Sequence, residues 1–274
     1  MRKKILIIGT SGYLGKNLKK NLSKKYKIIS SHLRDRRKID ICNYKKLKNF
    51  IKINDINYLI NCSGQFIEDF DKFKEISILG NKNIIDLAKN FNFKVIFCST
   101  TSVLGNKKDD YTKIKILAEN LYLKSKIDYR ILRIGNVYDS GLKKKGLLRN
   151  LMLFFNNKLK NIEIKNVQNF RNFIHIDDFC SLTSIIIKNW TKYRKNQLLT
   201  VTENLKIKNI ISYFVKKYPL KKINKQNLAI KNTKEGSIFI NNSLVANKYF
   251  KYTKTVYLER VIKNLQFNGK YIQK

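Results

Sequence analysis

Residues 5–15 read Ile5-Leu6-Ile7-Ile8-Gly9-Thr10-Ser11-Gly12-Tyr13-Leu14-Gly15, an apolar run followed by three glycines spaced three residues apart. Leucines then recur with helical spacing through Leu22, so the stretch predicts a strand, a tight turn and a helix. The start of such a helix offers unpaired N–H groups and a positive dipole end to an anion, and the diphosphate of a dinucleotide fits this site. The alternative is an ordinary strand-to-helix turn. The candidate cofactor-binding residues here are Gly9, Ser11, Gly12, Tyr13, Leu14 and Gly15.

Short apolar runs and helix-period stretches alternate through the first half of the chain. The predicted strands cover residues 5–8, 26–30, 58–62, 95–98 and 130–134. The predicted helices cover residues 14–22, 44–53, 73–88 and 114–123. This alternation is typical of βαβ units, which right-handed crossovers wind into a parallel sheet with helices on both faces. We therefore predict an α/β fold with a Rossmann-like, doubly wound parallel sheet.

The pattern loosens after Gly135. Further helices are predicted over 147–159, 179–190, 207–218 and 256–265, and further strands over 162–164 and 198–201. We expect a dinucleotide-binding domain over residues 1–140 and a smaller C-terminal substrate lobe over 141–274, with the chain crossing between them.

The formal net charge is +39, from 58 Lys and Arg against 19 Asp and Glu among 274 residues. The lysines are spread over nearly every segment, and the chain is also rich in Asn, Ile, Tyr and Phe with a single proline. These are the amino acids of A/T-rich codons, so coding bias explains the whole set, whereas nucleic-acid binding explains only the lysines. We expect no specific nucleic-acid partner, although the charge favours anionic substrates.

Cysteine spacing and hydropathy exclude several other classes. Cys42, Cys62, Cys98 and Cys180 lie far apart without metal-ligand spacing, so we expect neither a metal site nor a disulfide framework. No apolar stretch approaches the length of a membrane span. The basic start and the apolar run at residues 5–8 superficially resemble a signal peptide, but the run is short and leads into the glycine turn. We expect a cytoplasmic protein.

The segment after the second predicted strand bears on cofactor choice. No acidic residue precedes Asp35 there, whereas Arg34, Arg36 and Arg37 crowd the loop. Basic groups without a carboxylate suit a 2′-phosphate, which favours NADP(H) over NAD(H), although these arginines could equally be solvated loop residues. Further on, Asp40 could accept a hydrogen bond from an adenine amino group or cap the following helix.

Candidate catalytic residues follow the fourth predicted strand. Tyr111 and Lys115 are four residues apart and share one helix face, and Thr100 lies in a hydroxyl cluster just before them. A nearby ammonium and an oxidised nicotinamide both favour the phenolate and bring its pKa toward the working range of a base. Four other Tyr/Lys pairs have the same spacing, at 44/48, 122/126, 213/217 and 218/222, and only position distinguishes this one.

Residues 171–178 read Arg171-Asn172-Phe173-Ile174-His175-Ile176-Asp177-Asp178. A guanidinium such as that of Arg171 binds a diphosphate in bidentate fashion. In isolation His175 and the two aspartates look catalytic. We interpret His175 instead as a packed core or interface residue, and the two aspartates as caps of the next helix.

Taken together, these motifs resemble the extended short-chain dehydrogenase/reductase superfamily, in its nucleotide-sugar epimerase/dehydratase/reductase branch. The matching stretches are GTSGYLG at 9–15, DI at 40–41, NCSG at 61–64, STTSVLG at 99–105, YTKIK at 111–115, LRIGNVY at 132–138 and RNFIHIDD at 171–178. Two positions differ from the family pattern, since Leu104 replaces a common tyrosine and Ser77 a common asparagine. The stretch from Thr100 to Tyr111 is also shorter than in many sugar-nucleotide epimerases.

The resemblance implies catalytic positions for Thr100, Tyr111 and Lys115. It implies cofactor contacts from the glycine turn and from Arg34, Asp40, Ile41, Cys62, Ser63, Gly64, Tyr111 and Lys115. It implies substrate contacts from Thr100, Asn136 and Arg171. The expected activity is that of an NAD(P)-dependent nucleotide-sugar oxidoreductase or epimerase, as a 4-keto-sugar reductase or a 4-epimerase, with a homodimer possible by family likeness. The alternative is a non-catalytic NADP(H)-binding regulatory protein of the same fold.

Overall fold

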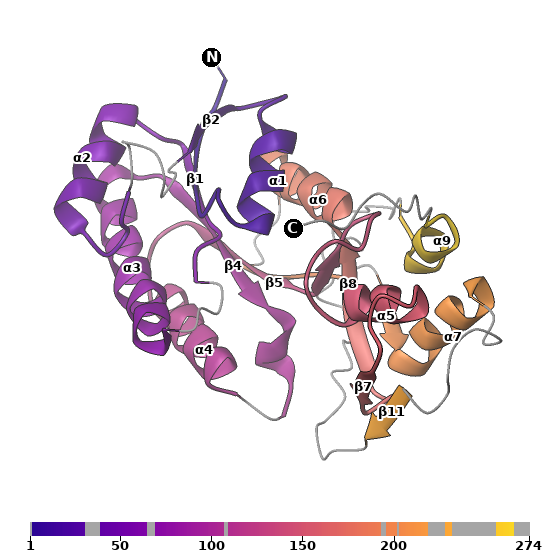
Figure 1. Ribbon diagram of the computed structural model, residues 1–274. Helices are drawn as coiled ribbons and strands as arrows, with labels where there is room; N and C mark the ends of the chain where they lie inside the picture. Colours follow the sequence, from indigo (N-terminus) through magenta and orange to yellow (C-terminus); the bar gives the residue numbers. More distant parts are fainter. Residues whose placement is uncertain are drawn as a thin grey trace.

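The computed structural model describes residues 2–30, 39–64, 69–106, 109–192, 196–201, 203–218, 228–231 and 256–265. A parallel sheet of six strands lies at its centre, in the order β2-β1-β3-β4-β5-β9 (Figure 1). These strands are β1 (Lys4–Ile8), β2 (Lys27–Ser30), β3 (Tyr58–Asn61), β4 (Lys94–Thr100), β5 (Tyr129–Ile134) and β9 (Gln197–Thr200). The predicted Rossmann-like parallel sheet is confirmed. Strand order reverses between β1 and β3, and ligands of such sheets bind at the carboxyl ends beside this point.

Helices cover both faces of this sheet (Figure 1). One face packs against α1 (Tyr13–Leu22) and α6 (Ile176–Lys188), and the other against α2 (Tyr44–Asn54), α3 (Phe70–Phe91) and α4 (Asp110–Leu123). Strand β1 shows why its apolar run is continuous, because Ile5 and Ile7 enter one core while Leu6 and Ile8 enter the other.

The second lobe has its own core, in which Phe155 stacks on Phe214 with ring centroids 5.4 Å apart. Its helices are α5 (Leu147–Phe155), α7 (Ile207–Lys217) and α9 (Leu258–Lys263). Its strands are β6 (Asn136–Tyr138), β8 (Phe170–His175) and β10 (Glu203–Lys206) in one sheet and β7 (Ile162–Lys165) with β11 (Leu228–Lys231) in another. The chain leaves the main sheet after β5, returns with α6 and β9, and leaves again with β10.

Several boundaries differ from the sequence-based prediction. Helix α5 ends at Phe155 rather than at residue 159, and Asn157 follows it with a φ of 57°. Helix α6 begins three residues earlier than predicted because His175 caps it. Strands β6, β8, β10 and β11 are not predicted from the sequence, since short runs of three to six residues carry little periodic signal.

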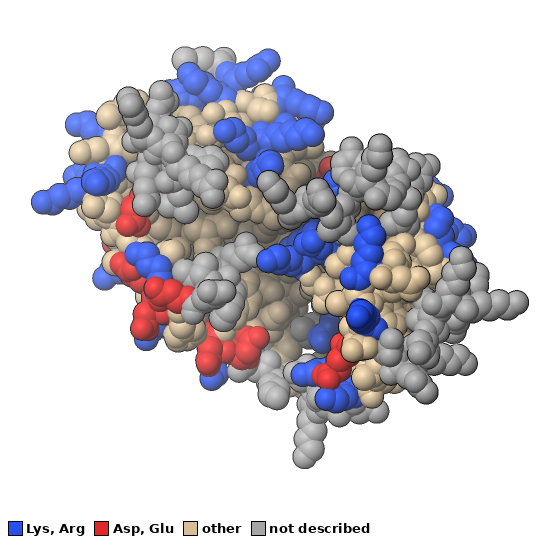
Figure 2. Space-filling model, viewed as in Figure 1, with Lys and Arg blue, Asp and Glu red and all other residues tan. Residues whose placement is uncertain are grey.

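The surface charge is unevenly distributed. Figure 2 shows Lys and Arg over much of the visible face, whereas acidic side chains gather along α3 and α4. The exposed acidic residues of this region are Asp69, Asp71, Glu75, Asp109 and Asp110. The basic residues on this face therefore form no single stripe along one element. Within the described ranges, no helix combines the length and the apolarity that crossing a bilayer requires.

Candidate active site

The glycine turn has the geometry that close approach of a diphosphate requires. Gly9 has a φ of 80°, a value that favours glycine, and its carbonyl oxygen accepts a hydrogen bond from the N–H of Gly12 at 3.0 Å. A Cβ on Gly15 would lie 2.3 Å from that oxygen, so only glycine lets α1 pack so close to the end of β1. Gly12 begins the helix without a capping side chain and lines a cavity, which leaves the first N–H groups of α1 available to an anion.

Two alanine substitutions in this turn are expected to separate folding from binding. Gly15→Ala should lower the free energy of unfolding by about 1–3 kcal/mol, because its Cβ overlaps backbone. The Cβ that Gly12→Ala adds meets only the Gly9 carbonyl oxygen, at 3.3 Å, so this substitution should lower the free energy of unfolding by less than about 1 kcal/mol. Gly12 lines the cavity at the start of α1, so the added methyl group should crowd a diphosphate bound there, and dinucleotide affinity should fall at least about tenfold. Urea unfolding and cofactor titration measure both effects, and equal losses of stability in the two variants would contradict this account.

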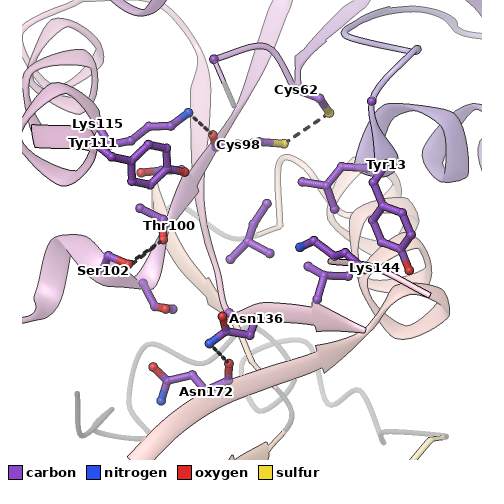
Figure 3. Close-up of a pocket in the computed structure, with 18 of the residues that line it drawn as sticks. Tyr13, Cys62, Cys98, Thr100, Ser102, Tyr111, Lys115, Asn136, Lys144 and Asn172 are labelled. Carbon is purple, nitrogen blue, oxygen red and sulfur yellow. Dashed lines mark hydrogen bonds between the residues drawn. The ribbon is translucent and has the colours of Figure 1, made fainter. Parts of the chain in front are cut away.

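A cavity of about 830 Å³ opens at the carboxyl ends of the central strands. From the first lobe it is lined by residues 12–15 of the glycine turn, 62–64 after β3, 98–102 of β4 and the short 3₁₀ helix η1 (Thr101–Leu104), and 109–111 and 115 at α4. Residues 134–137, from the end of β5 into β6, line it next. The second lobe adds residues 144 and 170–172. The glycine turn and the Thr100, Tyr111 and Lys115 side chains therefore face one space (Figure 3).

Helix α4 positions Tyr111 and Lys115 at the cavity wall. The Asp109 carboxylate accepts the N–H of Thr112 at 2.8 Å and so begins the helix just before Tyr111. The Tyr111 ring stacks on Phe73 with centroids 5.5 Å apart, and Lys115 Nζ lies 5.9 Å from the centre of the Tyr111 ring. Lys115 Nζ also donates a hydrogen bond to the carbonyl oxygen of Cys98 at 3.3 Å (Figure 3).

Burial dominates the protonation of this pair. It raises the pKa of Tyr111 to about 12, with the Asp109 and Cys98 side chains adding to the rise. It lowers the pKa of Lys115 to about 8, because an ammonium is poorly solvated there. The expectation that the Lys115 ammonium and an oxidised nicotinamide together lower the Tyr111 pKa stays a prediction; among the protein groups, burial raises this pKa.

Lys115→Met should stabilise the protein at neutral pH. The folded state holds this ammonium with a pKa near 8, against 10.5 when solvated, so its burial costs about 3 kcal/mol below pH 8. After subtracting about 1 kcal/mol for the lost hydrogen bond to Cys98, the variant should be about 2 kcal/mol more stable. Between pH 8 and 10.5 the unfolded chain binds the proton that the folded state has lost, so wild-type stability rises relative to the variant. Urea unfolding at about pH 7 and about pH 10 tests this sign, and an unchanged difference refutes it.

The hydroxyl cluster lies beside Tyr111. Thr100 Oγ1 accepts the N–H of Ser102 at 3.2 Å and donates to Ser102 Oγ at 3.2 Å, which begins η1 (Figure 3). Ser102 also lines the cavity, although it is not among the site residues predicted from the sequence. Its position in the hydroxyl run 99–102 was the available signal.

A buried ion pair holds α4 against the sheet beneath the site. Glu119 is one helical turn beyond Lys115, and its carboxylate accepts Arg133 Nη2 at 2.6 Å and Nε at 3.1 Å. Ser99 Oγ donates to the same carboxylate at 2.6 Å. These bonds join α4 to β5 and β4, so they fix the helix that carries Tyr111 and Lys115.

Comparison with known proteins identifies the family. Residues 5–201 match the model of the NAD dependent epimerase/dehydratase family. The chain belongs to this family. It is 27% identical to a dTDP-D-glucose 4,6-dehydratase of Dictyostelium discoideum over 68% of this chain, and spans 55% of that protein's length. It is 24% identical to an ADP-L-glycero-D-manno-heptose-6-epimerase of Brachyspira hyodysenteriae, over 69% of this chain and 73% of the relative.

The fold of this epimerase/dehydratase family member is also found among solved structures. The Bordetella bronchiseptica enzyme WbmG, crystallised with NAD and UDP, superposes with a TM-score of 0.80 at 14% identity. The superposition covers 97% of this chain and 94% of WbmG, so both lobes share its architecture.

Two of the residues expected to contact the cofactor, Asp40 and Ile41, do not border the cavity in the part of this epimerase/dehydratase fold that the structure describes. Asp40 does not cap α2: its carboxylate accepts the N–H of Cys42 at 2.9 Å, and Asn43 caps the helix instead. Ile41 is 4% exposed and packs against Gly80. Neither Asp40 nor Ile41 is among the described residues that line the cavity, and Arg34 lies outside the described residues together with Arg36 and Arg37.

The remaining cofactor residues divide into two groups. Cys62, Ser63 and Gly64 line the cavity after β3, and the sulfur atoms of Cys62 and Cys98 lie 3.6 Å apart (Figure 3). Gly9 and Ser11 are not among the described lining residues, because Gly9 builds the turn and Ser11 is exposed.

The residues of the second lobe that were expected to contact substrate border the same cavity. Asn136 and Arg171 line the cavity, and Asn136 Nδ2 donates to the carbonyl oxygen of Asn172 at 3.1 Å. His175 is 1% exposed and bonded to Ser140 at 3.1 Å, so its interpretation as a packed residue is confirmed. The interpretation of Asp177 and its neighbour as caps is wrong, since His175 Nδ1 accepts the Asp177 N–H and both aspartates lie in the first turn of α6.

Proposed function

We propose that this protein transfers a hydride between a nicotinamide cofactor and a carbon of a nucleotide-linked sugar, as a 4-keto-sugar reductase or a 4-epimerase. The observation that carries the proposal is the shared cavity, into which the glycine turn opens and which Thr100, Tyr111 and Lys115 line. The glycine turn fits a dinucleotide diphosphate, and the cofactor supplies the redox chemistry when bound.

The protein's own groups supply proton transfer and orientation. Tyr111 donates its phenolic proton to a sugar oxygen. The Thr100 hydroxyl turns its one hydrogen from Ser102 Oγ to the same sugar oxygen when substrate binds. Lys115 keeps its charge beside the phenol ring and stabilises the phenolate that remains. With a pKa of about 12, Tyr111 is protonated at neutral pH, which supports the direction in which a keto sugar is reduced.

The substrate class rests on the second lobe and on the relatives. Arg171 offers a guanidinium to a diphosphate. The relatives are named for reactions of dTDP- and ADP-linked sugars, and WbmG was crystallised with NAD and UDP. We infer a nicotinamide dinucleotide as cofactor. The preference for NADP(H) stays a proposal that rests on Arg34 and its neighbours, and the cytoplasmic location and homodimer stay predictions.

The decisive experiment incubates purified protein with sugar nucleotides and with their 4-keto forms while NAD(P)H absorbance is followed. Net consumption of NAD(P)H indicates a reductase, and interconversion of sugars without net consumption indicates a 4-epimerase. Tight NADP(H) binding without hydride exchange on any of these sugars would overturn the proposal and favour a regulatory protein.

A further inference from the structure

A loop of the second lobe is tied to the glycine turn by one carboxylate. Tyr13, the first residue of α1, donates its hydroxyl hydrogen to Asp139 Oδ2 at 2.8 Å. The other oxygen, Asp139 Oδ1, accepts the backbone N–H of Gly141 at 2.9 Å and of Lys143 at 3.2 Å. The Tyr13–Asp139 bond joins residues 126 positions apart in sequence. The two bonds to backbone N–H groups fix the start of the loop that leads to α5.

The same loop carries Lys144 to the cavity wall. Lys144 Nζ lies 5.6 Å from the centre of the Tyr13 ring, and both side chains border the cavity in Figure 3. Lys144 and Arg171 also line a second cavity of about 100 Å³ that adjoins the first. In the described part of the chain, no hydrogen bond or ion pair engages the Lys144 ammonium.

The surroundings of Lys144 suit an anionic ligand. Burial lowers the pKa of its ammonium, and Asp139 opposes that change only in part. A half-buried cation next to an aromatic ring gains most from a ligand that brings its own negative charge. A lysine supplies a point charge to a phosphate, whereas an arginine supplies a planar pair of donors, so Lys144 and Arg171 are complementary.

We propose that Lys144 is a second cation for a diphosphate bound beside Arg171, and that the Tyr13–Asp139 hydrogen bond positions the loop that presents it. The inference rests on the proposed function, because a nucleotide-linked sugar and a dinucleotide cofactor each carry one diphosphate. Lys144 belongs to the second lobe and lies beside Tyr13 of the glycine turn, so either diphosphate has the required chemistry.

The test compares Lys144→Met with the control Lys143→Met. The Lys143 side chain is exposed and is not among the described residues that line the cavity. Calorimetric titration uses UDP, dTDP, ADP and GDP in one arm and NAD⁺ and NADP⁺ in the other. Lys144→Met should lower the affinity for the ligand whose diphosphate it contacts by about ten- to hundredfold, and Lys143→Met should lower it by less than about twofold. A loss in the first arm assigns the substrate diphosphate, and a loss in the second assigns that of the cofactor. Affinities within about twofold of Lys143→Met in both arms, or no binding by wild type in either, overturn the inference.

The positioning role has its own readout. Tyr13→Phe keeps the ring and removes the hydroxyl that donates to Asp139, so affinity in the affected arm should fall about three- to tenfold. In the Lys144→Met background the same change should have no further effect, because the positioned cation is already gone. Additive losses overturn this role. These titrations need no turnover, so a wild type that binds the ligands but transfers no hydride would refute the proposed function and leave the Lys144 inference to be decided on its own.

Discussion

Tyr111→Phe is expected to lower kcat by about 10²- to 10⁴-fold, which is the usual contribution of a general acid or base. The substitution removes the phenolic proton of Tyr111, which lines the cavity together with Thr100 and Lys115, and it leaves the ring that stacks on Phe73. Cofactor affinity should therefore change little. Steady-state turnover on the sugar identified by the absorbance assay, together with cofactor titration, measures both quantities.

Tyr44→Phe is the matched control for this prediction. Tyr44 also precedes a lysine by four residues, but it is the first residue of α2, packs against the core and is not among the described cavity-lining residues. Its kcat should stay within about twofold of wild type. If Tyr111→Phe retained nearly full turnover, the proposed proton transfer would be wrong even though the fold is that of the family.

Glu119→Ala is expected to lower the free energy of unfolding by about 3–5 kcal/mol. The Glu119 side chain is 4% exposed and that of its partner Arg133 is 14% exposed, so the substitution leaves a buried guanidinium without its carboxylate. Ser99 loses its acceptor in the same step. Urea-induced unfolding followed by circular dichroism measures the change.

Glu75→Ala gives the comparison at the surface. Glu75 and Lys72 form an ion pair of similar length, 2.7 Å, but their side chains are 42% and 45% exposed. Exposed pairs of this kind contribute about 0–1 kcal/mol, so Glu75→Ala should lower the free energy of unfolding far less than Glu119→Ala does. Equal losses in the two variants would mean that burial does not decide the strength of the Glu119–Arg133 pair.

The parts of the fold that the sequence predicts are those with a local cause. The central strands are buried on both faces, so they appear as unbroken apolar runs such as residues 5–8, and the intervening helices show their own period. The strands of the second lobe are short and half-exposed in part, as in β10, and they leave no such signal. Of the two roles left open for Asp40, the role as cap of α2 is wrong: Asp40 and Asn43 are both good capping residues, and only the path of the backbone selects Asn43.

The sequence by itself determined the glycine turn, because the contact that excludes a side chain at Gly15 joins it to Gly9, six positions away in a continuous segment. It also placed Tyr111 and Lys115 on one helix face, which follows from helical spacing alone. Three further properties depend on tertiary contacts: this pair borders the cavity, burial raises the Tyr111 pKa, and Lys144 lies over Tyr13. These properties depend on which segments the sheet and the second lobe bring together, and such distant contacts leave no periodic pattern in the chain.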